Sequence, residues 1–309
     1  MSKKPKVGMW SGLTAVTAVL TAGAIVGTTV AFHYTTTVNN YLDADTYKII
    51  KGDSDEDTEY FKSDFTSDEE RESYEAELCA QVEAEGAALL KNDNNALPLA
   101  SGAKVSLFGH GSVDLMYGGT GSGSVDTSKA PNFKQALEDQ GIQVNSTLWD
   151  LYSSDDMMKN YSRITPAAIS DTLEANTQYA VNEAPWSKLS SAESSFADYG
   201  DAAIVVFSRS GGEGADLPSG ENGTNDSWIK GQEGDGNYLA LSAEEKELLQ
   251  NLKTLKDNGT FKKIIVLINS SNAIEMDFLN PEICGEDYGI DSAMWIGDVG
   301  QTGINGVAQ

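Results

Sequence analysis

Short apolar runs alternate with amphipathic stretches through the last two thirds of the chain. The run from Ala202 to Ser208 is continuously apolar and rich in β-branched residues, which is typical of a parallel strand covered on both faces. Similar runs recur between stretches of helical periodicity, and this alternation predicts an α/β fold in which helices sandwich a parallel-rich sheet. The expected strands are Val105–Phe108, Gln143–Ser146, Ala203–Phe207, Ile264–Ile268 and Ala293–Ile296.

Helices are expected between these strands. The clearest one has a capping box of Ser242 and Glu245 at its start and Gly259 just beyond its end, both of which are helix boundary signals. The interval from Leu148 to Tyr199 has no clear period, and its scattered aromatic residues fit either a functional rim or the packing of an irregular excursion. The expected helices are Asn132–Gln140, Thr165–Ala175 and Ala243–Asp257.

Another helix is expected before the first strand. Ser67 can cap the acidic residues that follow it, and this pattern marks a helix start. Apolar positions at Leu78, Val82 and Leu89 or Leu90 predict that the helix is amphipathic and continues to that point.

An uncharged stretch from Val7 to Phe32 lies near the N-terminus. A helix over Trp10–Phe32 would reach the roughly 30 Å of a bilayer core at about 1.5 Å per residue. Lysines precede the stretch and acidic residues follow it, so the positive-inside rule predicts a single-pass anchor in the cell membrane with the domain facing outside. Residues 1–38 are therefore expected to form a cytoplasmic tip and transmembrane anchor. A cleaved signal peptide is the alternative, which the length of the stretch disfavours.

An acidic segment, residues 39–68, follows the apolar stretch. It is rich in Asp, Glu, Ser, Thr and Tyr without sustained periodicity, which predicts a solvated stalk or arm. The acidic run from Asp53 to Asp57 lacks the ligand spacing of an EF-hand, so a solvated charge run is preferred to a calcium site. Residues 69–309 are expected to form the α/β domain.

Charge and cysteine content narrow the classes of partner. The formal net charge of -26 argues against nucleic acid as a partner, because phosphates would be repelled by this surface. Cys79 and Cys284 lie far apart without metal-ligand spacing, so no metal site is expected and buried free thiols are favoured over a disulfide.

One carboxylate stands in a glycine-rich turn directly after the apolar run 202–208. The segment Ser208–Pro218 reads Ser-Arg-Ser-Gly-Gly-Glu-Gly-Ala-Asp-Leu-Pro, and the glycines around Glu213 let the backbone approach a ligand closely. Ligands of parallel sheets bind outside the carboxyl ends of the strands, so Glu213 is a candidate proton donor. An exposed acidic loop is the alternative, because a lone glutamate is usually solvated.

Two other glycine-rich stretches do not fit nucleotide loops. After Gly109–Gly111, Asp114 stands where the dinucleotide fingerprint has its third glycine, and Gly118–Gly123 lacks the Lys-Ser/Thr of a P-loop. No cofactor is therefore expected. The second stretch fits equally a sugar-binding loop, whose backbone approaches hydroxyl groups, and a flexible connection. No nucleophile elbow surrounds His110, so a triad hydrolase has no support.

An ordered set of motifs resembles glycoside hydrolase family 3. Val82–Leu99, with its Lys-Asn and Leu-Pro-Leu, and the following Lys104–Gly109 are similar to the opening of that family's α/β sandwich domain. The resemblance covers residues 75–309. The later motifs, in the order of that domain, are Gly118–Gly123, Ser208–Pro218, Lys263–Ser271 and Trp295–Gln301.

The resemblance implies a flavodoxin-like α/β sandwich and a retaining, β-glucosidase-like activity on a β-linked glucoside or oligosaccharide. In many β-glucosidases of the family a Ser-Gly-Glu-Gly turn supplies the catalytic acid/base, which maps onto Glu213, with Asp216 orienting the turn. This sequence departs from the pattern by one extra glycine and by Leu217 where the family usually has Arg. The resemblance places the glycine-rich loop near the domain interface, and the candidate substrate-binding residues are Gly119, Gly121, Ser122 and Asp216.

The resemblance also implies a partner domain. Retaining hydrolysis needs two carboxylates about 5 Å apart, and in the family the second is an Asp on a TIM-type barrel that usually precedes the sandwich domain. A barrel of about 250 residues does not fit before residue 69, so the chain is expected to be the first domain of a permuted member, cut at Gln309 before the barrel. A non-catalytic extracellular carbohydrate-binding or interaction module is the alternative function.

Overall fold

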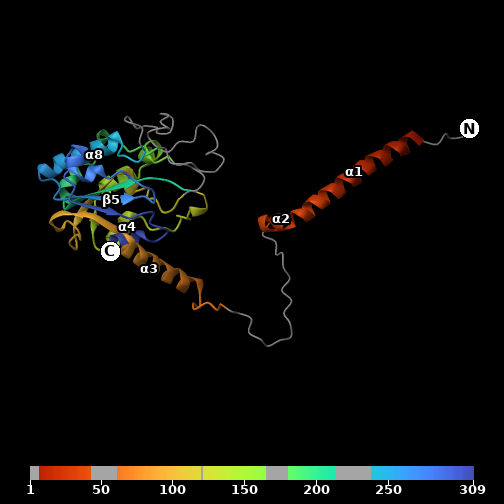
Figure 1. The fold of residues 1–309 in the computed structure, drawn as a ribbon, viewed down its shortest axis with the longest axis horizontal. Coiled ribbons are helices and arrows are strands. Elements are labelled where there is room, and N and C mark those ends of the chain that lie inside the picture. The colour runs from red at the N-terminus through yellow and green to blue at the C-terminus, as the bar shows by residue number, and fades with distance from the viewer. Residues whose placement is uncertain (1–6, 43–60, 120, 165–179, 213–237) are drawn as a thin grey trace, which may run out of the picture. The chain divides into compact units, whose positions relative to one another are not determined.

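The computed structural model describes residues 7–42, 61–119, 121–164, 180–212 and 238–309. These residues belong to two compact units, Met1–Asp64 and Phe65–Gln309, which are coloured along the chain in Figure 1. The acidic run from Asp53 to Asp57 and the helix expected at Thr165–Ala175 lie outside the described residues.

The first unit contains the helices α1 (Val7–His33) and α2 (Thr35–Tyr41). Within α1, the span Trp10–His33 has a mean hydropathy of 1.8 and is long and apolar enough to cross a membrane. Four threonines of α1 each donate a hydroxyl hydrogen bond of 2.8–2.9 Å to the carbonyl four residues earlier, so these polar groups are satisfied without water. The expected helix is confirmed. Its length and composition fit a membrane span, and a signal sequence near the N-terminus would meet the same criteria.

The second unit is built on a six-stranded sheet with the order β1-β6-β5-β4-β2-β3. β1 is antiparallel to β6, and all other neighbouring strands are parallel. The chain runs from β2 to β3 in one direction and from β4 to β6 in the other, so the strand order reverses between β2 and β4. Such a reversal opens a crevice at the carboxyl ends of the strands. The strands are β1 (Ala88–Asn92), β2 (Lys104–Phe108), β3 (Gln143–Val144), β4 (Ala202–Ser208), β5 (Ile264–Asn269) and β6 (Ser292–Trp295).

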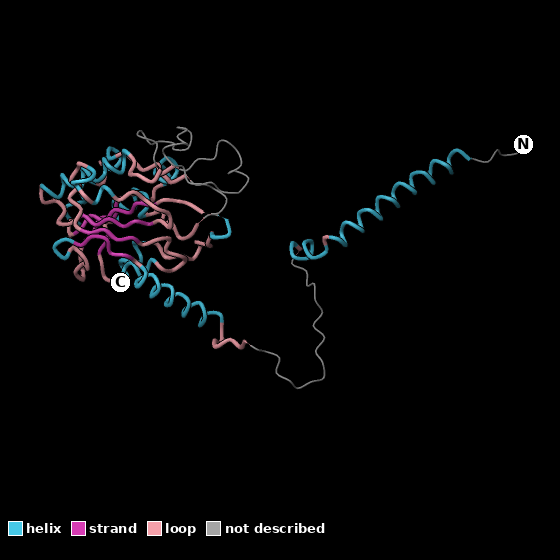
Figure 2. Tube along the Cα trace, viewed as in Figure 1, coloured by secondary structure: helices cyan, strands magenta, loops and turns pink. Residues whose placement is uncertain are grey.

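Helices cover both faces of the sheet, as Figure 2 shows around the magenta strands. In β4, Ala203, Val205 and Phe207 pack with α5, α6 and α8, whereas Ile204 and Val206 pack with α4 and α10. This alternation follows from the two-residue period of a strand. The helices are α3 (Asp68–Gly86), α4 (Phe133–Asp139), α5 (Ser146–Tyr152), α6 (Asp155–Tyr161), α8 (Ala243–Asp257), α9 (Pro281–Cys284) and α10 (Ile304–Ala308).

The sequence predicted most of this sheet. Four expected strands form within a residue or so of the predicted bounds, and the capping box of Ser242 and Glu245 starts α8 as expected. The strand expected at Gln143–Ser146 is shorter, because Asn145 accepts a hydrogen bond from the Leu148 N–H and caps α5. The unpatterned interval contributes packing: the ring of Trp186 is stacked 6.3 Å from that of Phe108.

The prediction for the helix that precedes the sheet was wrong in two respects. α3 ends at Gly86, and Leu89 and Leu90 belong to β1, where the backbone pairs with β6. The side chains of Leu78 and Val82 are exposed, so they do not form the buried face of the helix. α3 instead packs through Ala80 against α10.

Close backbone contact holds α3 and α10 together. At Gly306 of α10 an added Cβ would overlap the Ala80 carbonyl and lie 2.9 Å from the Ala84 nitrogen. At Gly303 a Cβ would lie 3.2 Å from the Cβ of Glu83. Glu83 is half-buried in this contact, and its Oε1 has no hydrogen-bond partner among the described residues. Burial raises the Glu83 pKa to about 7.

Both cysteines are free thiols. Cys79 is exposed on α3 and Cys284 is half-buried in α9. The expectation that both are buried was therefore wrong, because α3 buries Ala80 in its contact with α10 and leaves the neighbouring Cys79 outside it.

Candidate functional site

One side chain at the carboxyl edge of the sheet joins the loops after β2 and β6 to the end of β4. Asn269, the fully buried last residue of β5, accepts hydrogen bonds from the Met116 N–H at 2.6 Å and the Ser208 hydroxyl at 3.1 Å. Its amide nitrogen donates to the carbonyls of Met116 at 3.0 Å and Gly297 at 2.7 Å. All four hydrogen-bonding positions of the amide are used, so Asn269 fixes these loops relative to one another. The sequence signal that could have identified Asn269 is a polar residue that ends an apolar strand.

The turn that leads to the predicted acid/base begins at this edge. Ser208 and Ser210 are buried, and Gly211 packs so closely on the side chain of Asn272 that an added Cβ would overlap it. Only glycine fits at this position without movement of Asn272. The predicted site residues Glu213 and Asp216 lie outside the described residues, which end at Gly212 on this side.

A buried arginine, which the sequence analysis did not single out, holds the same turn. Arg209 is fully buried and forms a double hydrogen bond to the carboxylate of Glu245 at 2.8 and 2.7 Å. It also donates to the carbonyls of Tyr238 and Ala240, and the Tyr238 hydroxyl accepts from the Ser210 N–H at 2.8 Å. Burial works against the charge of Arg209, yet Glu245 raises the Arg209 pKa above its ordinary value. Residues 209–210 are therefore clamped to residues 238–240.

The glycine-rich loop approaches the turn after β4. A Cβ added to Gly119 would lie 3.2 Å from the Gly211 carbonyl oxygen and 3.6 Å from the Gly212 Cα. Gly121 and Ser122 lie in a short 3-10 helix and are exposed. Three of the predicted substrate-binding residues are described. The structure brings Gly119 to the turn after β4, whereas Gly121 and Ser122 lie further along the loop.

A cleft of about 440 Å³ opens beside the glycine-rich loop. Its charged side chains are Asp114 and Arg163, which the sequence analysis did not pair. The Arg163 guanidinium donates to the Asp114 carbonyl at 2.8 Å and lies 3.3 Å from the Asp114 carboxylate. The cleft is further lined by Val113, Leu115, Met116, Tyr117, Gly118, Gly119, Ser124, Val125 and Thr127.

The buried side chains of His110 and Glu183 fix the backbone position of Arg163. The His110 Nε2 accepts a hydrogen bond from the backbone N–H of Arg163 at 3.0 Å. The ring proton therefore lies on Nδ1, which is 3.5 Å from the Glu183 carboxylate. Glu183 is buried and accepts hydrogen bonds from the backbone N–H groups of His110 and Ala184. Although three titratable residues surround His110, no His, Cys, Asp or Glu group in the described part of the chain is arranged to hold a metal ion.

Asp298, in the motif Trp295–Gln301, is a second carboxylate at this edge. It accepts hydrogen bonds from the Ser271 backbone at 3.2 Å and the Ser271 hydroxyl at 2.9 Å. Burial raises the Asp298 pKa, and these hydrogen bonds and the Arg163 charge partly oppose the rise. Arg163 therefore lies within electrostatic reach of two carboxylates, Asp114 and Asp298.

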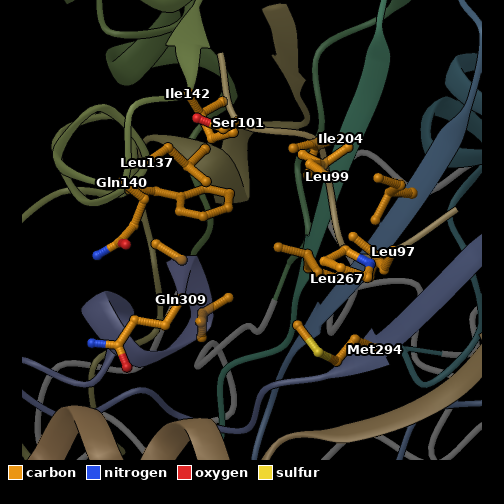
Figure 3. Close-up of a pocket in the computed structure, with 15 residues that line it drawn as sticks. Leu97, Leu99, Ser101, Leu137, Gln140, Ile142, Ile204, Leu267, Met294 and Gln309 are labelled. Atoms are coloured by element: carbon orange, nitrogen blue, oxygen red, sulfur yellow. The ribbon is translucent and has the colours of Figure 1, made fainter. Parts of the chain in front are cut away.

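A second cavity, of about 250 Å³, lies against one face of the sheet and is mainly apolar. Figure 3 shows Ile204 and Leu267 of the sheet on one side of it and Leu137 and Gln309 on the other. The polar side chains of its described walls are a serine and two glutamines, without a titratable group. The cavity lacks groups for acid/base chemistry, which separates it from the polar edge described above.

The fold and the carboxyl-edge loops match a known domain. Residues 87–309 match the glycosyl hydrolase family 3 C-terminal domain. The chain belongs to this family, as its motifs suggested.

Two enzymes are informative relatives. A β-glucosidase of Ruminococcus albus is 29% identical over 236 residues, which are 75% of this chain and 21% of the relative. β-Glucosidase A of Butyrivibrio fibrisolvens is 31% identical over 216 residues, which are 64% of this chain and 23% of the relative. The chain thus spans less than a quarter of the length of these relatives, in which the domain is part of a longer enzyme.

Solved structures show the same fold. A β-glucosidase from Paenibacillus barengoltzii has a TM-score of 0.53 at 27% identity, over 75% of this chain and 22% of that one. β-Glucosidase 3B from Thermotoga neapolitana in complex with glucose has a TM-score of 0.54 at 24% identity, over 77% of this chain and 29% of that one.

Proposed function

We propose that this chain is the acid/base-bearing domain of a retaining, β-glucosidase-like glycoside hydrolase. The supporting observation is the turn after β4: Gly211 and Gly212 leave the carboxyl edge of the sheet against Gly119, at the reversal of strand order. The same edge carries the ligand in other sheets of this topology. Glu213 follows Gly212 directly in the sequence and is our candidate for the proton donor, with Asp216 orienting its turn.

The proposed reaction has two steps. Glu213 gives its proton to the glycosidic oxygen as an aspartate on a TIM-type barrel attacks the anomeric carbon, and Glu213 then takes a proton from the water that hydrolyses the glycosyl-enzyme. Gly119, Gly121 and Ser122 would contact the β-linked glucoside or oligosaccharide. Burial beside the barrel would keep Glu213 protonated near neutral pH.

We further propose that α1 anchors the enzyme in the cell membrane with the domain outside. α1 supplies a span of sufficient length and hydropathy, and Lys3, Lys4 and Lys6 precede it, as in cytoplasmic tips. The substrate would then be an extracellular glycoside.

Replacement of Glu213 by Ala in the barrel-containing enzyme tests the catalytic role. Glycosides with poor leaving groups should lose most activity, because they need protonation, and activated aryl glucosides should lose less in the first step. Added azide should restore turnover of aryl glucosides, because a small anion attacks the glycosyl-enzyme without base assistance. Glu221→Ala and Glu233→Ala are the matched controls. Ordinary activity of Glu213→Ala on cellobiose, or azide rescue in a control variant, would move the role to another carboxylate.

The 309-residue chain alone should not hydrolyse aryl β-glucosides, because this assignment needs a second carboxylate from the barrel. Turnover by the purified chain above a blank without enzyme would contradict the two-domain proposal. A carbohydrate-binding module is the second candidate. It predicts no loss of catalysis in Glu213→Ala.

A further inference from the structure

The pair formed by Asp114 and Arg163 has no part in the proposed proton transfer, yet it lines the cleft. The Arg163 side chain is 8% exposed, whereas that of Asp114 is 29% exposed. The carboxylate is therefore the more accessible member of the pair. An arginine buried to this degree costs desolvation energy, which its carboxylate partner offsets.

The charges of the cleft favour a neutral ligand. Asp114 compensates the guanidinium, so a phosphate or carboxylate ligand would gain little from Arg163 and would be repelled by Asp114. A hydroxyl group suits both members, since it can donate to the carboxylate and accept from the guanidinium. Two neighbouring hydroxyls would therefore match the pair.

An aromatic side chain at the same cleft adds an apolar surface. Tyr117 is half-buried and lines the cleft, and its hydroxyl donates to the Pro131 carbonyl at 3.0 Å. This bond ties the tip of the side chain to the protein. A ligand with an apolar face and a rim of hydroxyls, such as a pyranose, fits an aromatic ring beside a donor and acceptor pair.

We propose that Asp114 and Arg163 form a binding subsite for a hydroxyl pair of a neutral sugar, with Tyr117 beside the sugar ring. This inference rests on the proposed function for its class of ligand, and it names side chains that neither the motifs nor the proposed reaction involve. The subsite lies next to Gly119, so it would hold a sugar unit of the same substrate.

The site is built before a ligand arrives. His110 holds the backbone of Arg163, and the carbonyl and carboxylate of Asp114 hold its guanidinium. Binding therefore needs little ordering of side chains, which reduces the entropic cost of association.

The direct test is a titration of the 309-residue chain with cellobiose, in which NMR monitors the signals of the arginine Nε–H groups. The sequence contains three arginines, Arg71, Arg163 and Arg209, so two of them act as internal controls. The chain is kept in a detergent whose head group is not a sugar, because a sugar head group would compete with cellobiose. We expect the Arg163 signal, assigned through its loss in Arg163→Lys, to shift and to saturate at millimolar cellobiose. An Arg163 signal unmoved by cellobiose, or moved equally by inorganic phosphate, would overturn the proposal.

Matched variants test the carboxylate. Asp114→Asn should weaken cellobiose binding at least tenfold. Asp201→Asn is the control. The Asp201 carboxylate pairs with Lys262 at the amino end of β4, and its side chain is 36% exposed, similar to that of Asp114. This variant should bind cellobiose like the parent chain. Equal binding by both variants would overturn the proposal. If Asp114→Asn does not fold, the titration of the parent chain decides alone.

The assay measures binding without turnover, so it separates this inference from the catalytic one. A catalytic defect in Glu213→Ala together with unchanged cellobiose binding in Asp114→Asn would refute the subsite only. Saturable binding at Arg163 together with normal activity of Glu213→Ala would refute the acid/base role only.

Discussion

Replacement of Glu83 by Gln should stabilise the domain at alkaline pH and leave it unchanged at acidic pH. Glu83 faces Gly303, the residue that precedes α10, and burial raises the Glu83 pKa from 4.5 to about 7. The folded state therefore binds more protons than the unfolded state between these two values. The stability that Glu83 contributes is fully present below about pH 4.5 and is lost as the pH rises through about 7. Glutamine has the same shape without the charge, so it removes this loss.

The size of the effect follows from the pKa rise. One pKa unit corresponds to about 1.4 kcal/mol, so the rise from 4.5 to about 7 sets a ceiling of about 3 kcal/mol. Glu83 is only half-buried, and solvent screening reduces this to about 1–2 kcal/mol. For a domain of this size the melting temperature at pH 8 should rise by about 2–8 °C.

Thermal unfolding at pH 5, 6, 7 and 8, followed by tryptophan fluorescence in the full chain, measures this difference. Glu77→Gln is the matched control, because Glu77 is exposed on the same helix. The control should follow the parent chain at every pH. Parallel pH profiles for Glu83→Gln and the parent, or destabilisation by Glu83→Gln at pH 8, would refute the argument.

Three further outcomes are expected. Glu245→Gln leaves the Arg209 charge buried without its partner and should lower the free energy of unfolding by about 3–5 kcal/mol; a loss below about 1 kcal/mol in urea unfolding would contradict this. Asn269→Ala leaves the Met116 N–H, the Gly297 carbonyl and the Ser208 hydroxyl without this partner and should lower the free energy of unfolding by about 1–3 kcal/mol; an unchanged midpoint in urea unfolding would contradict this. In fractionated cells the protein should remain in membranes and be digested by external protease, whereas a soluble form that begins near Tyr34 would show a cleaved signal.

The central strands could be predicted from sequence because their signals are local. β4 and β5 are continuous apolar runs, and the start of α8 carries its own capping residues, so no distant contact is needed to identify them. β1 could not be identified in this way. Leu89 and Leu90 continue the apolar spacing of α3, and only pairing with β6, some two hundred residues later in the chain, makes them a strand.

The site was predictable only in part for the same reason. The glycines of the turn and of the loop mark close backbone approach, and the structure brings Gly119 to Gly211. The pairs Arg209–Glu245 and Asp114–Arg163 join residues 36 and 49 positions apart. Each partner alone resembles an ordinary surface charge, and burial of the pair arises only when the strands assemble.

The clamp between residues 209–210 and 238–240 has a consequence for how such domains diversify. Because Arg209 and Tyr238 already bring the two ends of the intervening segment together inside the protein, its length and composition can change at little cost to the sheet, since loop-closure entropy grows slowly with length. Segments of other family members could therefore be transplanted between Gly212 and Tyr238 while the framework stays intact. The clamp therefore separates the stability of the sheet from the sequence of the segment that it closes.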